Sequence, residues 1–392
     1  MPLSNTLTGL IPVIYRAMQV TSREPLFALR GATIDARAEQ AGLDQPVRAY
    51  IAPAATTETI TPSMAISDTG GQTMTYVDMT ISKVKRVRVP FSGEEIKSVG
   101  QAGYEEITRL RFEQAIRALV NEMEADAVTE LYTNASRAVG DASADPFASN
   151  FNYVADANKI LQDNGAPGAN DPSYRTMVTS TTYGASLRKL SALYTVANAG
   201  TDATLRNGII PPLLGYTVGE SAQISQHVKG AGTGYDVASG GEAVGQTTLS
   251  LEGGTVNSTG IKAGDIVTFS GGTTDTNKYV VNTGLTSTSG DIVIGNPGLK
   301  VVKVDADEMT IGNSYTPTIL FSRNALAFAA RLPAVPNGRD QAVDSIEMRD
   351  PITGIMFSIR HYLGDHAEMY SVEAAWGKKV TQSEHVALIL GL

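Results

Sequence analysis

The sequence predicts an α+β protein that carries a second, small β domain inserted into its middle. Residues 228–312 hold 17 of the 38 glycines of the chain, and no arginine occurs between Arg206 and Arg323. A long helical pattern precedes this stretch, and apolar segments separated by turns follow it. Because the flanking segments read as parts of one larger domain, the stretch interrupts a host domain.

The composition predicts a folded protein without disulfides. The chain has 392 residues, is 42% hydrophobic and contains no cysteine, so burial and subunit contacts must stabilise it. Its net charge of −9 argues against a dedicated nucleic-acid binder, although loose contact with DNA is compatible with it. No basic region precedes the N-terminal apolar run, and apolar runs are far shorter than the roughly 20 residues that span a bilayer. We expect no secretory signal and no membrane insertion.

Residues 1–50 predict an N-terminal arm. Helical pieces such as residues 6–18 are joined by prolines, and the segment has too little apolar surface to fold alone. We therefore expect the arm to dock on a neighbouring element or on a neighbouring subunit.

Residues 51–100 predict an extended β-hairpin arm. A turn signal at 67–71 precedes an alternating run over 73–91. The two faces of that run differ, with apolar Val87, Val89 and Phe91 on one and basic Arg86 and Arg88 on the other. With little chain nearby to cover it, the hairpin is expected to reach out of its own subunit.

Residues 101–227 predict a long spine helix followed by a segment of mixed structure. The helix is predicted over 103–135 by an apolar stripe at steps of three and four, formed by Phe112, Ile116, Leu119, Met123, Ala127 and Leu131. Charged residues are expected on its other faces: Arg109, Glu113, Arg117, Glu124 and Glu130. At 1.5 Å per residue this helix would be about 50 Å long, which suits a spine.

The segment after this helix predicts a unit of mixed structure. We expect a helix over 151–163, a strand over 174–178, a helix from about 181 and a short strand over 213–220. These elements lead the chain into the inserted domain.

Short β-branched runs separated by turn residues predict a small barrel or sandwich over 228–312. Its strands are expected at 265–270, 278–282, 291–294 and 299–304.

Residues 313–392 predict strands that return to the host domain. A strand and a short helical or loop piece are expected over 319–336, followed by a hairpin over 345–361 with its turn at 350–354. Two further strands are predicted at 368–376 and 385–390.

Four segments resemble the major coat proteins of short-tailed Salmonella-type phages. They are FNYVADANKIL (151–161), SRNALAFAARLP (322–333), the turn DPITG (350–354) and WGKKVTQSEHVALILG (376–391). The order of the predicted elements resembles that family over nearly the whole chain, whereas the insertion resembles it only in GIKAGDIVTFSG (260–271).

This resemblance implies the Hong Kong 97-type capsid fold with an inserted β-barrel. It implies that residues 101–227 hold the spine helix, the peripheral domain and the first part of the apical domain, and that residues 313–392 are the return strands of the apical and peripheral domains. It implies a major capsid protein that assembles as pentamers and hexamers into an icosahedral shell, guided by a scaffolding protein. The shell would expand as double-stranded DNA is packaged through a portal, and a decoration protein is a possible partner. The expected location is the virion capsid, assembled in the cytoplasm of a bacterial host.

Seven basic residues are candidates for contacts in such a shell. On this interpretation Lys83, Lys85, Arg86 and Arg88 meet acidic groups of an adjacent subunit, and the alternative is that they form a solvated strand face. Arg109, Arg111 and Arg117 are candidates for an inner face of the spine helix toward scaffold or DNA. The alternative for these arginines is that they are the wet face of a long helix.

No pattern predicts catalysis, a cofactor or a metal site. The glycine-rich run at 230–236 lacks the spacing and the Lys-Ser/Thr end of a phosphate loop, and no G-x-S-x-G occurs. The residues His361, Asp365, His366 and Glu368 lack the ligand spacing of known zinc motifs. Two other functions stay open, namely an encapsulin-like nanocompartment shell and a β-rich tail or adhesin protein. The inserted domain argues against the first, and the spine helix and missing export signal against the second.

Overall fold

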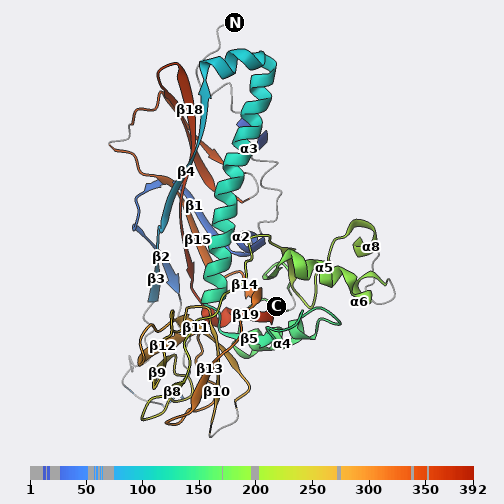
Figure 1. Cartoon of the computed structure of the whole chain (residues 1–392), viewed down its shortest axis with the longest axis vertical. Helices are drawn as coiled ribbons and strands as arrows, with labels where there is room; N and C mark the ends of the chain where they lie inside the picture. Colours follow the sequence, from blue (N-terminus) through green and yellow to red (C-terminus); the bar gives the residue numbers. More distant parts are fainter. Residues whose placement is uncertain are drawn as a thin grey trace.

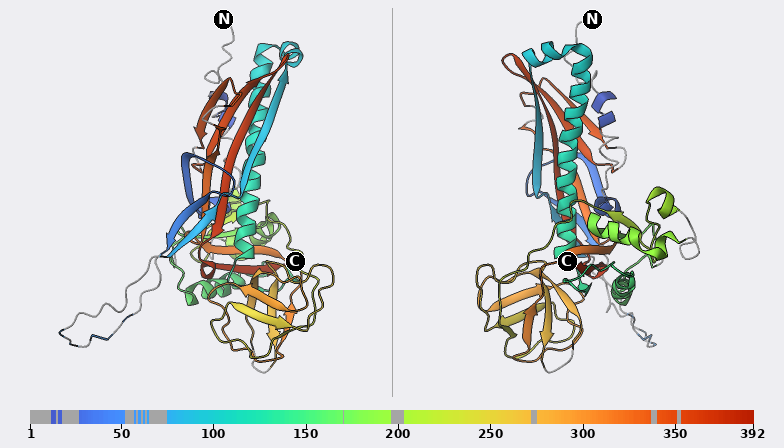
Figure 2. Two further views of the ribbon diagram at one scale, coloured as in Figure 1. Left: turned by 90° about the vertical axis from the view of Figure 1, so that its left-hand side faces the viewer. Right: turned by 45° about the vertical axis from the view of Figure 1, so that its right-hand side comes forward.

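This computed structural model describes residues 12–14, 16–17, 27–51, 57, 59–60, 62, 64, 75–169, 171–195, 203–271, 275–336, 340–350 and 353–392. The molecule is elongated: the spine helix α3 (Gly93–Thr133) runs along a twisted sheet, and a β-barrel lies at one end (Figure 1). Three short helices project sideways near that end (Figure 2), namely α5 (Thr181–Lys189), α6 (Ser191–Tyr194) and α8 (Ala203–Asn207). The predicted α+β class with an inserted β-domain is confirmed.

The spine helix is confirmed, but it begins at Gly93 and not at residue 103. Ser92 and Glu95 form a capping box, in which each side chain accepts a hydrogen bond from the backbone N–H of the other at 3.2 Å. Gly100 and Gly103 weaken the helical pattern in the first turns, which explains why the prediction starts late. All six apolar positions of the predicted stripe are buried.

Two charged positions of α3 are buried. Glu113 and Glu124 lie off the apolar stripe, as expected, but their exposed fractions are only 7% and 0%. Both carboxylates have hydrogen-bond partners that lie outside the apolar stripe, because other parts of the chain cover α3 on more than one face. Glu113 accepts from Arg109 of the same helix, and Glu124 accepts from the backbone of α2 (Phe27–Gly31).

A six-stranded sheet packs against the spine helix. Its central strand, β18 (Ala367–Val380), pairs along one edge with β4 (Lys83–Ser92) and along the other with β17 (Met356–Leu363) and β15 (Leu326–Pro333). The sheet is completed by β16 (Asp344–Arg349) beside β17 and by β1 (Thr33–Ala41) parallel to β15. The main core lies between this sheet and α3.

A hairpin does form in this region, but its strands are not the ones predicted within 51–100. The run 73–91 is two strands: β3 (Thr75–Thr80) pairs with β2 (Pro46–Ile51), whereas β4 pairs with β18. The expectation that β4 is uncovered was also wrong, since Val89 and Phe91 are buried in the core. The predicted turn at 67–71 lies outside the described residues.

Much of the predicted N-terminal arm docks on its own subunit. From Phe27 onward, α2, β1 and β2 all join elements of the same chain. Of the helical piece predicted at 6–18, residues 12–14 and 16–17 are described, and these are helical.

The apical part is built on five strands that belong to one continuous 11-stranded sheet with the barrel. Their order is β5 (Arg137–Gly140), β19 (Val386–Gly391), β14 (Thr316–Ser322), β6 (Arg175–Thr179) and β7 (Thr217–Glu220). The predicted helix at 151–163 is α4 (Asn152–Asp163), and the helix expected near 181 is α5, capped by the Ser180 hydroxyl. A separate core joins these helices to the sheet.

The inserted domain is a closed antiparallel barrel with its own core. Its strand order is β10 (Ile266–Ser270), β13 (Glu308–Ile311), β8 (Tyr235–Val237), β9 (Thr248–Glu252), β12 (Gly290–Ile294) and β11 (Lys278–Thr283), and β11 pairs back with β10. The strand predicted at 299–304 is wrong. There Leu299 and Lys303 are buried while Val302 and Val304 are exposed, and a single bridge between Glu242 and Lys303 replaces a ladder.

The barrel is attached to its host by paired linkers and by a shared strand edge. His227 and Tyr315, in the entering and leaving linkers, exchange two backbone hydrogen bonds. The His227 ring lies 2.8 Å from the Asp265 carboxylate, and β11 pairs with β5 of the apical sheet. No helix in the described part of the chain is long and apolar enough to cross a membrane.

Candidate assembly interface along the spine helix

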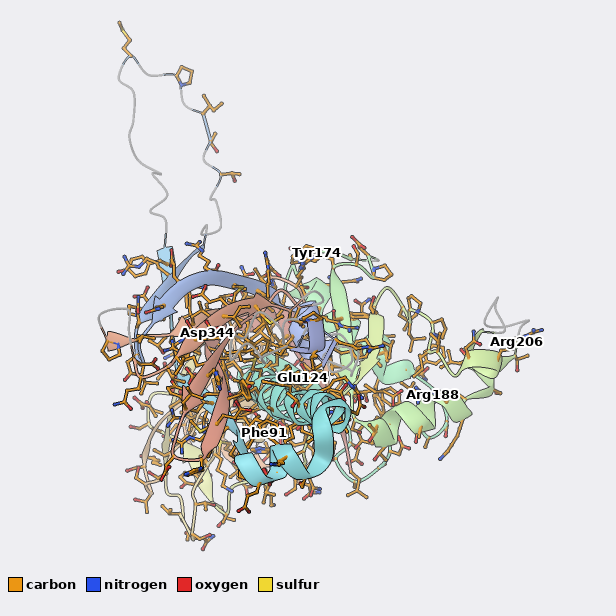
Figure 3. All side chains as sticks on the ribbon, turned by 90° about the horizontal axis from the view of Figure 1, so that it is seen from above. Phe91, Glu124, Tyr174, Arg188, Arg206 and Asp344 are labelled. Carbon is orange, nitrogen blue, oxygen red and sulfur yellow. The ribbon has the colours of Figure 1, made fainter. Side chains whose placement is uncertain are left out.

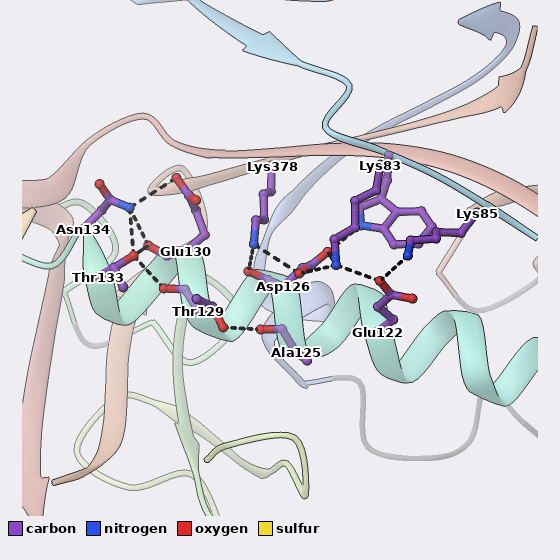
Figure 4. A network of polar contacts seen from close by, with 11 residues as sticks. Lys83, Lys85, Glu122, Ala125, Asp126, Thr129, Glu130, Thr133, Asn134 and Lys378 are labelled. Atoms are coloured by element: carbon purple, nitrogen blue, oxygen red, sulfur yellow. Dashed lines mark hydrogen bonds and ion pairs between the residues drawn. The ribbon is translucent and has the colours of Figure 1, made fainter. Parts of the chain in front are cut away.

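A stripe of carboxylates on α3 binds the six-stranded sheet. Glu122, Asp126 and Glu130 follow one another at steps of four, so they lie on one face of the helix. Asp126 is the centre of this network (Figure 4): its carboxylate accepts from Trp376 Nε1 at 2.9 Å and from Lys83 Nζ at 3.0 Å. These contacts join α3 to both β4 and β18.

Two further contacts extend the network toward the C-terminal end of α3. Lys378 Nζ donates to the Asp126 backbone carbonyl at 2.9 Å, and the Glu130 carboxylate accepts from the Val380 N–H at 3.3 Å. Burial tends to raise the pKa of Asp126, but the hydrogen bonds from Trp376 and Lys83 outweigh it and hold the pKa below its usual value. Asp126 is therefore a charged anchor between helix and sheet.

Lys83, predicted as a contact to an adjacent subunit, is bound within its own. It lies 2.7 Å from Glu122 and 3.0 Å from Asp126, and Lys85 lies 3.7 Å from Glu122. Burial lowers the pKa of Lys83, but its hydrogen bonds to Glu122 and Asp126 outweigh this effect and raise the pKa above the usual value. Most of its charge is thus already neutralised before any other chain is present.

Arg86 and Arg88 differ from the two lysines. Both side chains are exposed, and no carboxylate in the described part of the chain forms an ion pair with either. They project from β4, and among the described strands only β18 pairs with β4, which leaves its other edge open within this part of the chain. An open edge strand is a template for pairing with another chain.

An apolar groove lies between β4 and the upper part of α3. Its volume is about 730 Å³, and its walls include Val87, Phe91, Ile107, Leu110 and Arg111. Leu110 is 44% exposed there, although it is a large apolar side chain. Such exposed apolar surface, rimmed by charges, is typical of interaction sites.

The three spine-helix arginines do not form one exposed basic run. Arg109 is paired with Glu106 at 2.5 Å and with Glu113 of the same helix. Arg111 donates to the Pro90 carbonyl at 2.5 Å, and its guanidinium lies 4.5 Å from the centre of the Phe91 ring. Arg117 is half-buried. Their role on an inner face of a shell stays a prediction.

Sequence reasoning missed Glu122, Asp126 and Trp376. The spacing of four between the acidic residues was visible in the sequence. Which strands lie opposite these residues could be seen only in the structure. The four residues considered for metal fall into two pairs: buried His361 lies 3.2 Å from Glu368 and stacks on Tyr370 at 4.7 Å, while exposed His366 lies 3.5 Å from Asp365. Across the described residues, no group of three or more His, Asp or Glu side chains is arranged to hold a metal ion.

Solved phage structures are similar to this chain over nearly its whole length. A chain from Mycobacterium phage Che8 has 15% identity and a TM-score of 0.48, covering 93% of this chain and 91% of its own. The capsid of cyanophage P-SCSP1u has 9% identity and a TM-score of 0.49, covering 92% and 86%. A virus-like particle from Pyrococcus furiosus has 9% identity and a TM-score of 0.44, covering 97% and 98%. A scan against protein-family models finds no match, and neither does a comparison with curated proteins.

Proposed function

We propose that this chain is the major capsid protein of a tailed double-stranded DNA phage, a structural protein that self-assembles into an icosahedral shell. The assignment to the coat proteins of short-tailed Salmonella-type phages belongs to this proposal. Scaffolding protein, portal, packaged DNA and a decoration protein are its proposed partners, and the virion formed in a bacterial cytoplasm is its proposed location.

One observation carries the proposal: β4 and α3 leave an exposed apolar groove between them, while Arg86 and Arg88 on the opposite face of β4 have no ion-pair partner among the described residues. A chain that bound no partner there would leave Leu110 and the groove in water. The spine network also makes α3 and the sheet one rigid unit, as a repeating subunit of a shell requires.

A second copy of the chain carries a segment of complementary charge. Between Arg48 and Lys83 the sequence contains no lysine or arginine, but it has the acidic residues Glu58, Asp68 and Asp78, of which Asp78 is paired with Arg48 of its own chain at 3.0 Å. Within the same stretch Ile60 and Met64 are fully exposed apolar side chains. We expect the acidic residues to meet Arg86 and Arg88 of a neighbouring copy and the apolar side chains to reach its groove, and heterologous contacts of this kind close into rings.

The proposed function is tested by the mass of the purified protein in solution. Analytical ultracentrifugation of the wild type, alone and coexpressed with the neighbouring phage genes, should show species far larger than the 41.3 kDa chain. A chain that stays monomeric under both conditions would contradict the proposal.

A further inference from the structure

Glu124 is a buried carboxylate that faces away from the sheet network. Its side chain has no exposed surface, and its two oxygens accept from the backbone N–H groups of Ala28 at 2.9 Å and Leu29 at 3.1 Å. The hydroxyl of Ser221, which follows β7, donates to the same carboxylate. Figure 3 shows Glu124 in the middle of the molecule, between the spine helix and α2. One side chain thus joins three segments that are distant in the sequence.

The helix that Glu124 holds is wedged between the spine and the apical sheet. Phe27 packs so closely on Gly219 of β7 that a methyl group at position 219 would overlap its ring. At the other end of α2, Gly31 lies against Thr176 and Phe321 of strands β6 and β14. Glu124 and these close contacts together hold α2 in its seat.

The charges around Glu124 leave it poorly compensated. From α2, Arg30 is the cation that acts on it, and the segment after β7 supplies the neutral Ser221. The neighbouring Glu220 is itself paired with Arg188, and the carboxylates of Glu122 and Asp126 on α3 are engaged with β4 and β18. Burial dominates over the hydrogen bonds and Arg30, and it raises the pKa of Glu124 to about 7.

We propose that Glu124 is a proton-operated clamp for α2: it holds α2 firmly when it is protonated and loosens its hold when it is ionised. Loss of the clamp detaches α2 from its seat. The clamp acts within a single subunit, so it does not depend on shell formation.

The sign follows from comparing the closed and open states. When α2 leaves, water reaches the carboxyl group and its pKa returns toward 4.5, below the value of about 7 in the closed state. The clamp is therefore strongest below pH 4.5 and weakens as the pH rises through 7. The closed state binds its proton about 300-fold more tightly, and the opening equilibrium shifts about 70-fold between pH 5 and pH 8.

Hydrogen exchange of the Ala28 and Leu29 amides measures this opening directly. After correction for the chemical exchange rate, their protection factors in the wild type should fall by about 70-fold from pH 5 to pH 8. In Glu124→Gln, which has no ionisable group, the protection should be the same at both values. Amides of β14 serve as the internal reference, since they report the stability of the apical core.

Glu122→Gln is the matched control, because it removes a carboxylate from another face of the same helix. This variant should keep the pH dependence of the α2 amides. Protection that is constant or rises with pH in the wild type would overturn the proposal, and so would an unchanged dependence in Glu124→Gln. The wild-type series decides the question even if the Gln variant does not fold.

Discussion

Replacing Asp126 by asparagine removes the charge on which three side chains of the sheet converge. The amide oxygen of asparagine can still accept from Trp376 Nε1, so the substitution keeps that bond and the size of the side chain. What is lost is the attraction to Lys83 and Lys378, which lie 3.0 and 3.3 Å away. Asp126→Asn therefore isolates the electrostatic part of the contact between spine helix and sheet.

The magnitude follows from burial. Side-chain exposure is 13% at Asp126, 32% at Lys83 and 17% at Lys378, so the pairs lie between the surface and the buried limit. Surface pairs contribute up to about 1 kcal/mol, and breaking a buried pair costs about 3–5 kcal/mol. We expect Asp126→Asn to lower the free energy of unfolding by about 2 kcal/mol. Asp126→Ala also strands the indole N–H of Trp376 and should cost about 3–5 kcal/mol.

Trp376 is the sole tryptophan of the chain and lies at this contact, so its fluorescence reports unfolding there. Urea denaturation of the dissociated subunit at pH 7 gives the comparison of wild type and variants. Because the folded-state pKa of Asp126 is lowered from 3.8, its contribution is present above pH 3.8 and disappears as the pH falls through the lowered value. The gap between wild type and Asp126→Asn should shrink accordingly in acid.

Glu122→Gln is the control for this prediction. Glu122 is 35% exposed, and Lys83 keeps Asp126 as a partner, so the loss should be about 0.5 kcal/mol or less. If Asp126→Asn unfolds at the same urea concentration as the wild type, or if Glu122→Gln costs more, the central place given to Asp126 is refuted.

Three other predictions concern assembly, the barrel and the seat of α2. The double substitution Arg86→Glu and Arg88→Glu should prevent assembly, as seen by ultracentrifugation, and leave the folded subunit intact, as seen by circular dichroism. Arg37→Glu, which changes an exposed charge beside Asp35, is the control. Full assembly of the double variant would count against the β4 edge as a contact. Lys303→Met leaves the buried Asp275 without its ion pair and should destabilise the barrel by about 3–5 kcal/mol in thermal unfolding. The exposed Lys229→Met should change nothing, and equal melting of the two would exclude a role for the buried pair. Gly219→Ala should displace Phe27 and speed hydrogen exchange in α2, whereas Gly42→Ala, with open space around it, should not.

Local periodicity was enough to predict the elements whose burial is set by their own sequence. The α3 stripe from Phe112 to Leu131, the helix α4 and barrel strands β10, β11 and β12 all have patterns that point to one structure. The start of α3 was missed because Gly100 and Gly103 interrupt the pattern after a sound capping box. The run 299–304 was mistaken for a strand because its valines are β-branched, although Val302 and Val304 face water.

Strand pairing could not be predicted in the same way. The alternation of Val87, Val89 and Phe91 suits a free arm and a sheet strand equally well, and the partner of β4 lies far along the sequence in β18. Because strand pairing could not be predicted, the contacts between α3 and the sheet could not be predicted either. Lys83 and Arg88 look alike in the sequence, but only Lys83 stands opposite the carboxylates of α3. The burial of Glu124 could not be predicted either, because nothing local shows that α2 covers it.

The most direct test of the shell proposal is electron microscopy of the purified protein, expressed with and without its neighbouring phage genes. The account predicts closed shells of uniform size built from pentamers and hexamers when those genes are present, and rings or aberrant shells when the scaffold is missing. Monomers or fibres under both conditions would contradict it.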